Sequence, residues 1–354
     1  MSKRIIFCSD GTWDTAASHT NVYKLYKSIT VSADQMPFYD DGVGASENPI
    51  IKLVGGAFGA GLFSKIKEGY TKIAQVYEAG DQVFLFGFSR GAYTARSLAG
   101  MIAISGLPTQ NFTDGLVDIA FRAYREKDNR EALLAQLKDS SMFDAKLTMV
   151  GVWETVGALG IPSVFGAVDP LLYGFLDTSL HPDVLNAYQA IAIDEKRAQF
   201  PPTLWNVNAQ NGQTVEQVWF SGVHSDVGGG EPIDGSEKTA LSDIALGWIM
   251  NKASKLGINF DAAVLKQYTM PLAAEYALDK LHTSWTVING FPKERSISPA
   301  AVIANSVSFR WTQDQSYRPK NLESKGGILS TQYVPEPVVT MPQPAPQAAG
   351  AAGS

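Results

Sequence analysis

Short apolar runs alternate along this chain with segments that have a helical pattern of apolar and polar positions. The runs VFLFGF and LTMVGVW are continuous, which is typical of strands buried on both faces of a parallel sheet. Helical segments that separate such strands indicate crossover connections. The pattern therefore predicts an α/β fold, with a mostly parallel central sheet flanked by helices.

The predicted elements can be given by residue number. We expect strands at residues 4–9, 36–39, 82–86, 146–153 and 217–223. We expect helices at residues 21–31, 64–78, 90–104, 113–124, 129–137, 182–194 and 241–256. Two apolar, glycine-rich stretches, residues 50–63 and the insertion at 157–176, are candidate walls of a hydrophobic pocket, with the insertion as a lid-like loop.

The composition changes at the C-terminus. Residues 334–354, VPEPVVTMPQPAPQAAGAAGS, are dominated by Pro, Ala and Gly and keep no apolar periodicity. Such a segment cannot bury enough surface to offset its ordering entropy, so we predict a disordered tail. Residues 1–333 are expected to form a single domain, with a core at about 3–256 and a C-terminal decoration of helices and loops at 257–333.

The stretch VFLFGFSRGAYTAR, residues 83–96, places a serine where a predicted strand meets a predicted helix. Ser89 has a glycine two residues away on each side, at Gly87 and Gly91. This spacing is typical of a nucleophile elbow, a tight turn that packs against neighbouring backbone and exposes the serine oxygen at the carboxyl edge of the sheet. We predict that Ser89 is a catalytic nucleophile rather than a small residue in a structural turn.

A serine nucleophile needs a base, and the base needs an acid that orients it. His224 is the best of the four histidines, because it directly follows the predicted strand at 217–223 and precedes a glycine-rich loop. Glu154 follows another strand end and lies between Ser89 and His224 in the chain, the order of α/β-hydrolases. Asp226 is a rival acid, although a carboxylate so near the histidine more often orders its own loop.

Two segments could supply the donors of an oxyanion hole. The backbone N–H of Arg90 begins the helix after Ser89, where unbonded donors and the helix dipole favour an anion. The second donor is expected from Gly11 or Thr12, in the loop after the first strand. Asp10 is a candidate supporting residue that would hold this loop by accepting N–H bonds, as in an Asx-type turn.

Composition and charge restrict the class of protein. The 354 residues have a formal charge of -6, which gives no reason to expect nucleic-acid binding. One cysteine excludes an intrachain disulfide, and we see neither a signal peptide nor an apolar stretch of roughly 18 residues that could span a membrane. We therefore expect a cytoplasmic protein, or one exported without a cleavable signal peptide. No zinc or calcium motif is found, so no metal ion or other cofactor is expected.

Eight segments taken together resemble a known family. In chain order they are IIFCSDGTWD, FYDDGVG, GGAFGAGL, LFGFSRGAYTAR, GVWETVGALGIP, FLDTSLHPDV, AIAIDEKRAQFPPTLW and VWFSGVHSDVGGG. Over residues 3–256 they resemble the α/β-hydrolase domain family of uncharacterised proteins that includes the type VI secretion phospholipase effectors. The resemblance implies an α/β-hydrolase fold and a Ser-Asp-His triad. The triad maps onto Ser89, His224 and Glu154, where members more commonly carry aspartate in a G-V-W-D-T run.

These observations predict a serine ester hydrolase of the phospholipase or lipase type that works through an acyl-enzyme. The substrate would be a lipid or another acyl ester, and the resemblance makes a secretion machine or an immunity protein a candidate partner. Two alternatives remain open. One is a cytosolic esterase or thioesterase acting on a soluble acyl substrate, and the other is a catalytically silent hydrolase-fold binding module.

Overall fold

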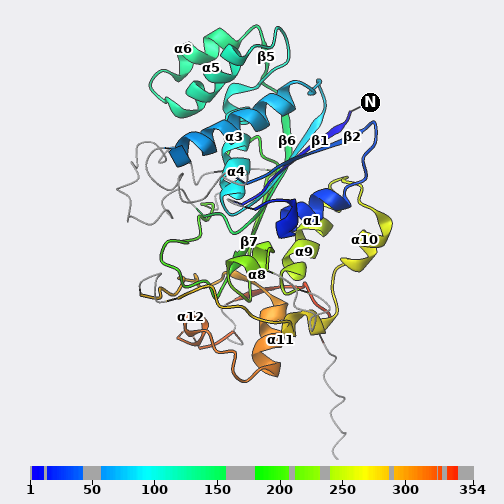
Figure 1. Cartoon of the computed structure of the whole chain (residues 1–354), viewed down its shortest axis with the longest axis vertical. Helices are drawn as coiled ribbons and strands as arrows, with labels where there is room; N and C mark the ends of the chain where they lie inside the picture. The colour runs from blue at the N-terminus through cyan, green and yellow to red at the C-terminus, as the bar shows by residue number, and fades with distance from the viewer. Residues whose placement is uncertain are drawn as a thin grey trace, which may run out of the picture.

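Eight strands of the computed structural model form one central sheet (Figure 1). They are β1 (Arg4–Ser9), β2 (Gln35–Asp40), β3 (Gln82–Phe88), β6 (Lys146–Trp153), β7 (Asn186–Ala192), β8 (Thr214–Phe220), β9 (Val302–Ala304) and β10 (Val334–Glu336). Their order is β10-β9-β8-β7-β6-β3-β1-β2, and every neighbouring pair runs parallel. The parallel sheet and the helices on both of its faces confirm the predicted α/β-hydrolase type of fold.

In the described part of the chain, helices and a further pair of short strands lie around this sheet. The helices are η1 (Ala16–Ser18), α1 (Asn21–Ser28), α3 (Ala57–Ala74), α4 (Arg90–Ser105), α5 (Asp114–Arg125), α6 (Arg130–Leu137), α8 (His224–Gly228), α9 (Ser242–Lys255), α10 (Ala262–Gln267), η4 (Ala274–Leu278), α11 (Asn305–Gln313) and α12 (Lys320–Glu323). Strands β4 (Leu107–Pro108) and β5 (Ser141–Met142) pair antiparallel in a separate small sheet. The structure describes residues 2–11, 14–42, 57–156, 180–206, 212–231, 240–286, 291–324, 326–328 and 333–341. None of the helices in these ranges is long and apolar enough to cross a membrane.

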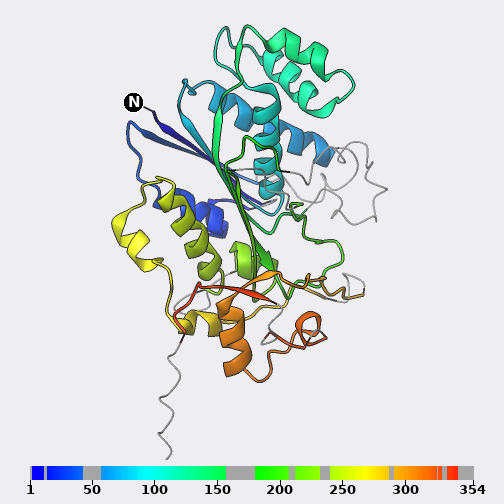
Figure 2. The same cartoon turned by 180° about the vertical axis from the view of Figure 1, so that it is seen from behind.

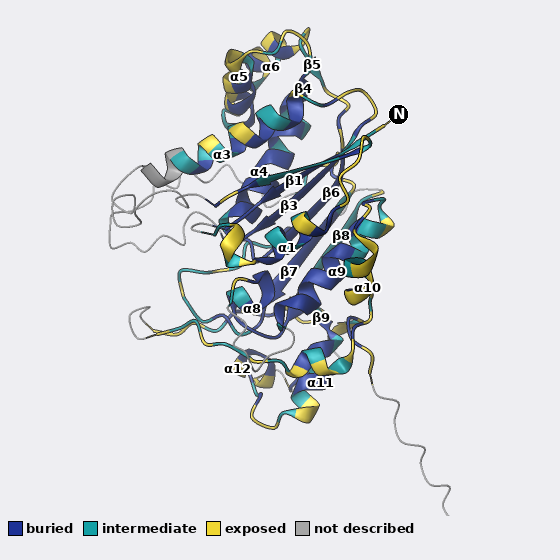
Figure 3. Cartoon of the chain, turned by 45° about the vertical axis from the view of Figure 1, so that its right-hand side comes forward, coloured by how far each residue is buried: buried dark blue, intermediate teal, exposed yellow. Residues whose placement is uncertain are grey.

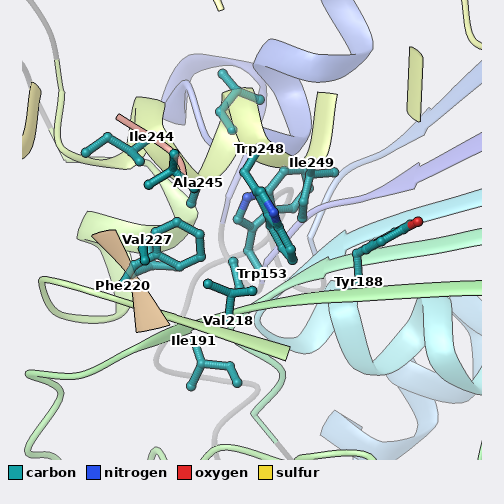
Figure 4. Packing of buried hydrophobic residues seen from close by; sticks show 14 of the residues in the cluster. Trp153, Tyr188, Ile191, Val218, Phe220, Val227, Ile244, Ala245, Trp248 and Ile249 are labelled. Carbon is teal, nitrogen blue, oxygen red and sulfur yellow. The ribbon is translucent and has the colours of Figure 1, made fainter. Parts of the chain in front are cut away.

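Each face of the sheet carries its own hydrophobic core. Figure 2 shows helices on both sides of the sheet, and Figure 3 shows that its strands are largely buried. Alternate residues of a strand point to opposite faces. In β1, Ile5 packs with α3 and α4, whereas its neighbour Ile6 packs with α1 and α9. The second core includes Trp153 and Trp248, which are both almost fully buried (Figure 4). Burial on both faces explains why these strands are continuous apolar runs in the sequence.

The strand order places a topological switch point beside β1. The chain runs from β1 outward to β2 and then returns to the other side of β1 to form β3. In open α/β sheets, ligands bind beyond the carboxyl ends of the strands at such a point. Ser89 follows β3 and Asp10 follows β1, so both lie at this position.

One predicted helix is wrong. Residues 182–194 were expected to be helical, but β7 occupies Asn186–Ala192 and pairs with β6 and β8. Almost every residue of β7 is buried. Small residues such as Ala187 and Ala190 have good helix propensity, but pairing between two buried strands decided the outcome here.

The structure adds two strands that the sequence did not predict, while the division of the chain near residues 256 and 333 stays a prediction. Strands β9 and β10 come from the segment treated as decoration and from the predicted tail, and both extend the central sheet. Val338 and Val339 are buried, and their N–H groups donate hydrogen bonds to Oδ1 of Asn305. Pairing with a strand already in place supplies the ordering that the composition of this segment lacks. Residues 342–354 lie outside the described part of the chain.

Candidate active site

Ser89 lies in the sharp turn between β3 and α4. Its backbone angles are φ 56° and ψ −117°, a left-handed conformation that a residue with a side chain rarely adopts. Such strain persists only where the surrounding structure enforces it. Here the Ser89 N–H donates to the carbonyl of Trp153 at 3.0 Å, which ties the turn to the end of β6. The conformation matches the predicted nucleophile elbow.

The two glycines of the elbow are required by close backbone packing. A Cβ atom on Gly87 would lie 2.3 Å from the carbonyl oxygen of Gly91. A Cβ atom on Gly91 would lie 2.1 Å from the carbonyl oxygen of Ser9, at the end of β1. Backbone cannot move aside as the end of a long side chain can, so only glycine fits at either position.

We expect Gly91→Ala to destabilise the protein by about 3 kcal/mol or more, because the new methyl group overlaps the backbone of β1. Gly115→Ala is the matched control, since a Cβ there meets only Thr113 Oγ1, at 3.7 Å. In the helix α5 that substitution should be neutral or stabilise by up to about 1 kcal/mol. Urea unfolding of both variants measures the difference, and equal stabilities would contradict the packing described above.

His224 is the first residue of α8, which a short connection at residues 221–223 joins to the end of β8. Its Nδ1 lies 2.8 Å from Oε2 of Glu154, and its ring packs on Phe88 with 4.7 Å between ring centroids. Phe88 is the residue before Ser89, so the imidazole lies beside the elbow. Burial lowers the pKa of His224 below its usual value, although the hydrogen bond and charge of Glu154 act in the opposite direction. A neutral imidazole whose Nδ1 is held by a carboxylate leaves Nε2 to act as a base.

Glu154 directly follows β6 and is fully buried. Its Oε1 accepts from the N–H of Ala192 at 2.6 Å and from Arg295 Nη1 at 2.8 Å. Its Oε2 accepts from Arg295 Nη2 at 2.9 Å and faces His224. Burial alone would raise the pKa of Glu154, but the charge of Arg295 and the bonds from His224 and Arg295 together lower it to about 2. The carboxylate is therefore ionised at any ordinary pH.

Asp226, the rival acid, contacts a different histidine. Its Oδ1 lies 2.6 Å from Nδ1 of His282, and its Oδ2 accepts the N–H groups of Val223 and His282. Asp226 thus orders the turn that begins α8 and ties it to the C-terminal segment. Among the described contacts, Glu154 is the carboxylate that meets the His224 ring.

The three candidate donors of the oxyanion hole differ in their surroundings. The N–H of Gly11 donates to Oδ1 of Asp10 at 2.8 Å, and Oδ2 of Asp10 accepts the hydroxyls of Thr20 and Tyr39. Asp10 therefore holds the loop after β1, as predicted. The same hydrogen bond occupies the N–H of Gly11, which is then not directed at a substrate. Arg90 is the first residue of α4, at the positive end of the helix. Thr12 lies outside the described residues.

Three charged residues near His224 were not predicted as site residues. Glu195 accepts the backbone N–H of His224 at 3.2 Å and forms an ion pair with Arg197 at 2.8 Å. Both belong to the segment AIAIDEKRAQF, so the family resemblance could have identified them. Arg295 lies in a segment without periodicity or a motif, and no sequence signal marks it.

A cavity of about 180 Å³ lies along α4 from Arg96 to Ile104, away from the elbow. Its walls include Ala99, Ile104 and Val150, with Arg96 and Trp205 at one side. The Arg96 guanidinium donates to the carbonyl of Thr203 at 2.6 Å and stacks on the Trp205 ring at 4.5 Å. The cavity is thus mostly apolar with one cationic group.

Other predicted features fall mainly outside the described residues. The lid-like insertion at 157–176 is not described, and of the stretch 50–63 only the beginning of α3 is. Within the described ranges, no group of three or more His, Cys, Asp or Glu side chains could hold a metal ion.

Comparisons with known proteins relate the chain to one family. A family model described as the catalytic domain of the Tle1-like phospholipase effectors of type VI secretion systems matches residues 3–252. The uncharacterised protein YEL023C of Saccharomyces cerevisiae is 28% identical over 226 residues, which cover 56% of this chain and 32% of the yeast protein. The chain thus matches about a third of the length of that relative.

Two solved structures are similar at a lower level. An uncharacterised protein from Pseudomonas aeruginosa has a TM-score of 0.43 at 18% identity, covering 76% of this chain and 47% of the other. A Tle1 effector, solved bound to the VgrG spike of a type VI secretion system, has a TM-score of 0.38 at 18% identity, covering 65% and 51%. Because both TM-scores are low, the assignment depends on the family model, which covers most of the chain. The chain belongs to the family of Tle1-like phospholipase effector catalytic domains.

Proposed function

We propose that this protein is a serine ester hydrolase of the phospholipase type, with Ser89 as nucleophile, His224 as base and Glu154 as the acid. The observation that carries the proposal is the 2.8 Å contact between His224 and Glu154 at the sheet edge where Ser89 forms a strained turn. Family membership supports phospholipase chemistry independently of this contact.

The proposed reaction begins when His224 Nε2 takes the proton of Ser89 Oγ as this oxygen attacks the ester carbonyl carbon. Glu154 keeps the imidazole in one tautomer and stabilises the imidazolium that forms. The tetrahedral intermediate then expels the alcohol, which receives the proton from His224, and leaves an acyl group on Ser89. Water, deprotonated by His224, attacks the acyl-enzyme, and the fatty acid is released as Ser89 recovers its proton.

The negative charge of the intermediate requires preorganised donors. We propose the backbone N–H of Arg90 as one donor, because it lies in the first turn of α4 beside the attacking oxygen. The side chain of Asp10 holds the N–H of Gly11 in this structure, so Gly11 could contribute only if that bond rearranged on substrate binding. Thr12 stays a prediction as the alternative second donor.

The proposed substrate is a phospholipid. Membership in a phospholipase effector family points to this class of substrate. Family membership also makes a component of a type VI secretion machine a candidate partner, and export through it would need no cleavable signal peptide. An immunity protein stays a predicted partner.

We expect the protein to release fatty acid from phospholipid vesicles with a higher kcat/KM than it shows on p-nitrophenyl butyrate. Free fatty acid released from vesicles and nitrophenol released from the soluble ester are measured side by side. Activity on the soluble ester alone would favour a general esterase. No activity on either, together with no labelling by a fluorophosphonate probe, would favour a silent binding module.

A further inference from the structure

Arg295 forms a two-pronged ion pair with the proposed catalytic acid. Its Nη1 lies 2.8 Å from Oε1 of Glu154 and its Nη2 lies 2.9 Å from Oε2, so the planar guanidinium fixes the plane of the carboxylate. The same nitrogens donate to the carbonyls of Ala192 and Phe200, each at 2.8 Å. Arg295 is therefore held between the end of β7 and the segment that follows it.

The ion pair is buried, so it cannot be a mobile surface contact. Arg295 is 6% exposed, and its Nε has no acceptor among the described residues. Glu154 is the carboxylate that Arg295 contacts, and it compensates the burial of the cation. Breaking a buried pair by removing one partner leaves an uncompensated charge. Removing either Arg295 or Glu154 would thus leave the other as an uncompensated buried charge.

Arg295 comes from beyond the part of the chain that the family model matches, which ends at residue 252. Its segment is anchored on both sides. The N–H of Lys293 donates to the carbonyl of Lys196 at 2.9 Å, and the carbonyl of Arg295 accepts from Asn321 at 3.3 Å. These backbone hydrogen bonds hold the segment around Arg295 in place, and the Arg295 side chain extends from it to Glu154.

We propose that Arg295 is a positioning residue of the active site, which holds the Glu154 carboxylate in the single orientation that serves His224. The proposal rests on the proposed triad. A glutamate has one more rotatable bond than an aspartate, so the longer acid in this chain has more freedom to remove. A fork of two N–H donors removes that freedom, because it fixes both oxygens at once.

Arg295 also affects how readily the site takes up a proton. The groups that face His224 and Glu154 are Arg295, Arg197 and Glu195, while Asp226 on α8 is paired with His282. The cation of Arg295 offsets the charge of Glu154 and so weakens the attraction of that carboxylate for a protonated imidazole. Without Arg295, the pair of Glu154 and His224 would bind a proton at higher pH, whichever of the two carries it.

The test compares Arg295→Met and Arg295→Lys with the wild type. We expect Arg295→Met to lower kcat on p-nitrophenyl butyrate by about 10- to 100-fold, with KM changed less than about twofold, because only the geometry of the acid is disturbed. The acid limb of the kcat/KM profile should move up by about one pH unit. Arg295→Lys keeps the charge but loses the fork, so it should fall between the two.

Two further measurements separate positioning from a structural role. Titration of the four histidines by NMR in Ser89→Ala protein reports the pKa of His224 without any turnover, and Arg295→Met should raise that pKa. In a Glu154→Gln background, Arg295→Met should change kcat by less than about threefold, because two residues that act as a unit are not additive.

Arg310→Met is the matched control. Arg310 is another buried arginine of the C-terminal segment, and it donates to the carbonyls of Ala277 and Asp279. The Arg310→Met variant should have a lower melting temperature than the wild type, with the pKa of His224 unchanged. If Arg295→Met also lowers only the folded fraction, with the His224 titration unmoved, the positioning role is wrong. If the wild type hydrolyses no ester but the His224 titration still shifts, the proposed function fails while the coupling of Arg295 to the Glu154–His224 pair stands.

Discussion

Ser89→Ala protein is expected to lose ester hydrolysis by a factor of about 10⁴ or more in kcat, because the proposed mechanism passes through an acyl group on the Ser89 oxygen. The strained turn is made by backbone contacts and by Gly87 and Gly91, so it does not depend on the serine hydroxyl. The variant should therefore fold as the wild type does. Nitrophenol release at saturating p-nitrophenyl butyrate measures the loss, and circular dichroism verifies the fold.

Ser97→Ala is a matched control for this experiment. Ser97 lies in α4, the helix that follows Ser89; it is fully buried, and its Oγ has no hydrogen-bond partner among the described residues. We expect this variant to keep the wild-type kcat. Substantial hydrolysis by Ser89→Ala protein would mean that another residue carries the chemistry.

The second large effect concerns the choice of acid. Glu154→Gln should lower kcat by about 10³- to 10⁴-fold, because an amide can hold the imidazole in the wrong tautomer and cannot stabilise the imidazolium. Asp226→Asn should cost less than about tenfold, since Asp226 contacts His282 and the backbone of the turn rather than the His224 ring. The two substitutions are alike in size and remove one negative charge each, so each serves as a control for the other.

Steady-state kinetics of both variants, measured at the pH optimum of the wild type, decides between the two carboxylates. A larger loss from Asp226→Asn than from Glu154→Gln would assign the acid to α8 and contradict the arrangement described above. A melting curve for each variant separates loss of activity from loss of fold.

Local signals in the sequence identify those parts of the candidate site that depend on local structure. The limits of β1 and β6 were predicted to the residue, because buried parallel strands are continuous apolar runs. The elbow at Ser89 could be predicted because glycine spacing and the change from strand to helix are both local features. The positions of Glu154 and His224 followed from one rule, that functional groups gather at the carboxyl ends of parallel strands.

The features that escaped prediction depend on contacts between distant segments. β7 contains small residues with good helix propensity, yet it forms a strand because it pairs with β6 on one side and β8 on the other. β10 has the composition of a disordered segment, yet it pairs with β9 at the edge of the sheet. Arg295 is 141 residues from Glu154 in the chain, and no local pattern records such a contact.

The central claim is that Ser89 is an activated nucleophile, and covalent labelling tests it most directly. Intact protein treated with a fluorophosphonate probe and analysed by peptide mass spectrometry should carry a single adduct on Ser89. His224→Ala protein should label far more slowly, because it lacks the base that activates the hydroxyl. An adduct on any other residue, or a labelling rate that does not depend on His224, would contradict the account.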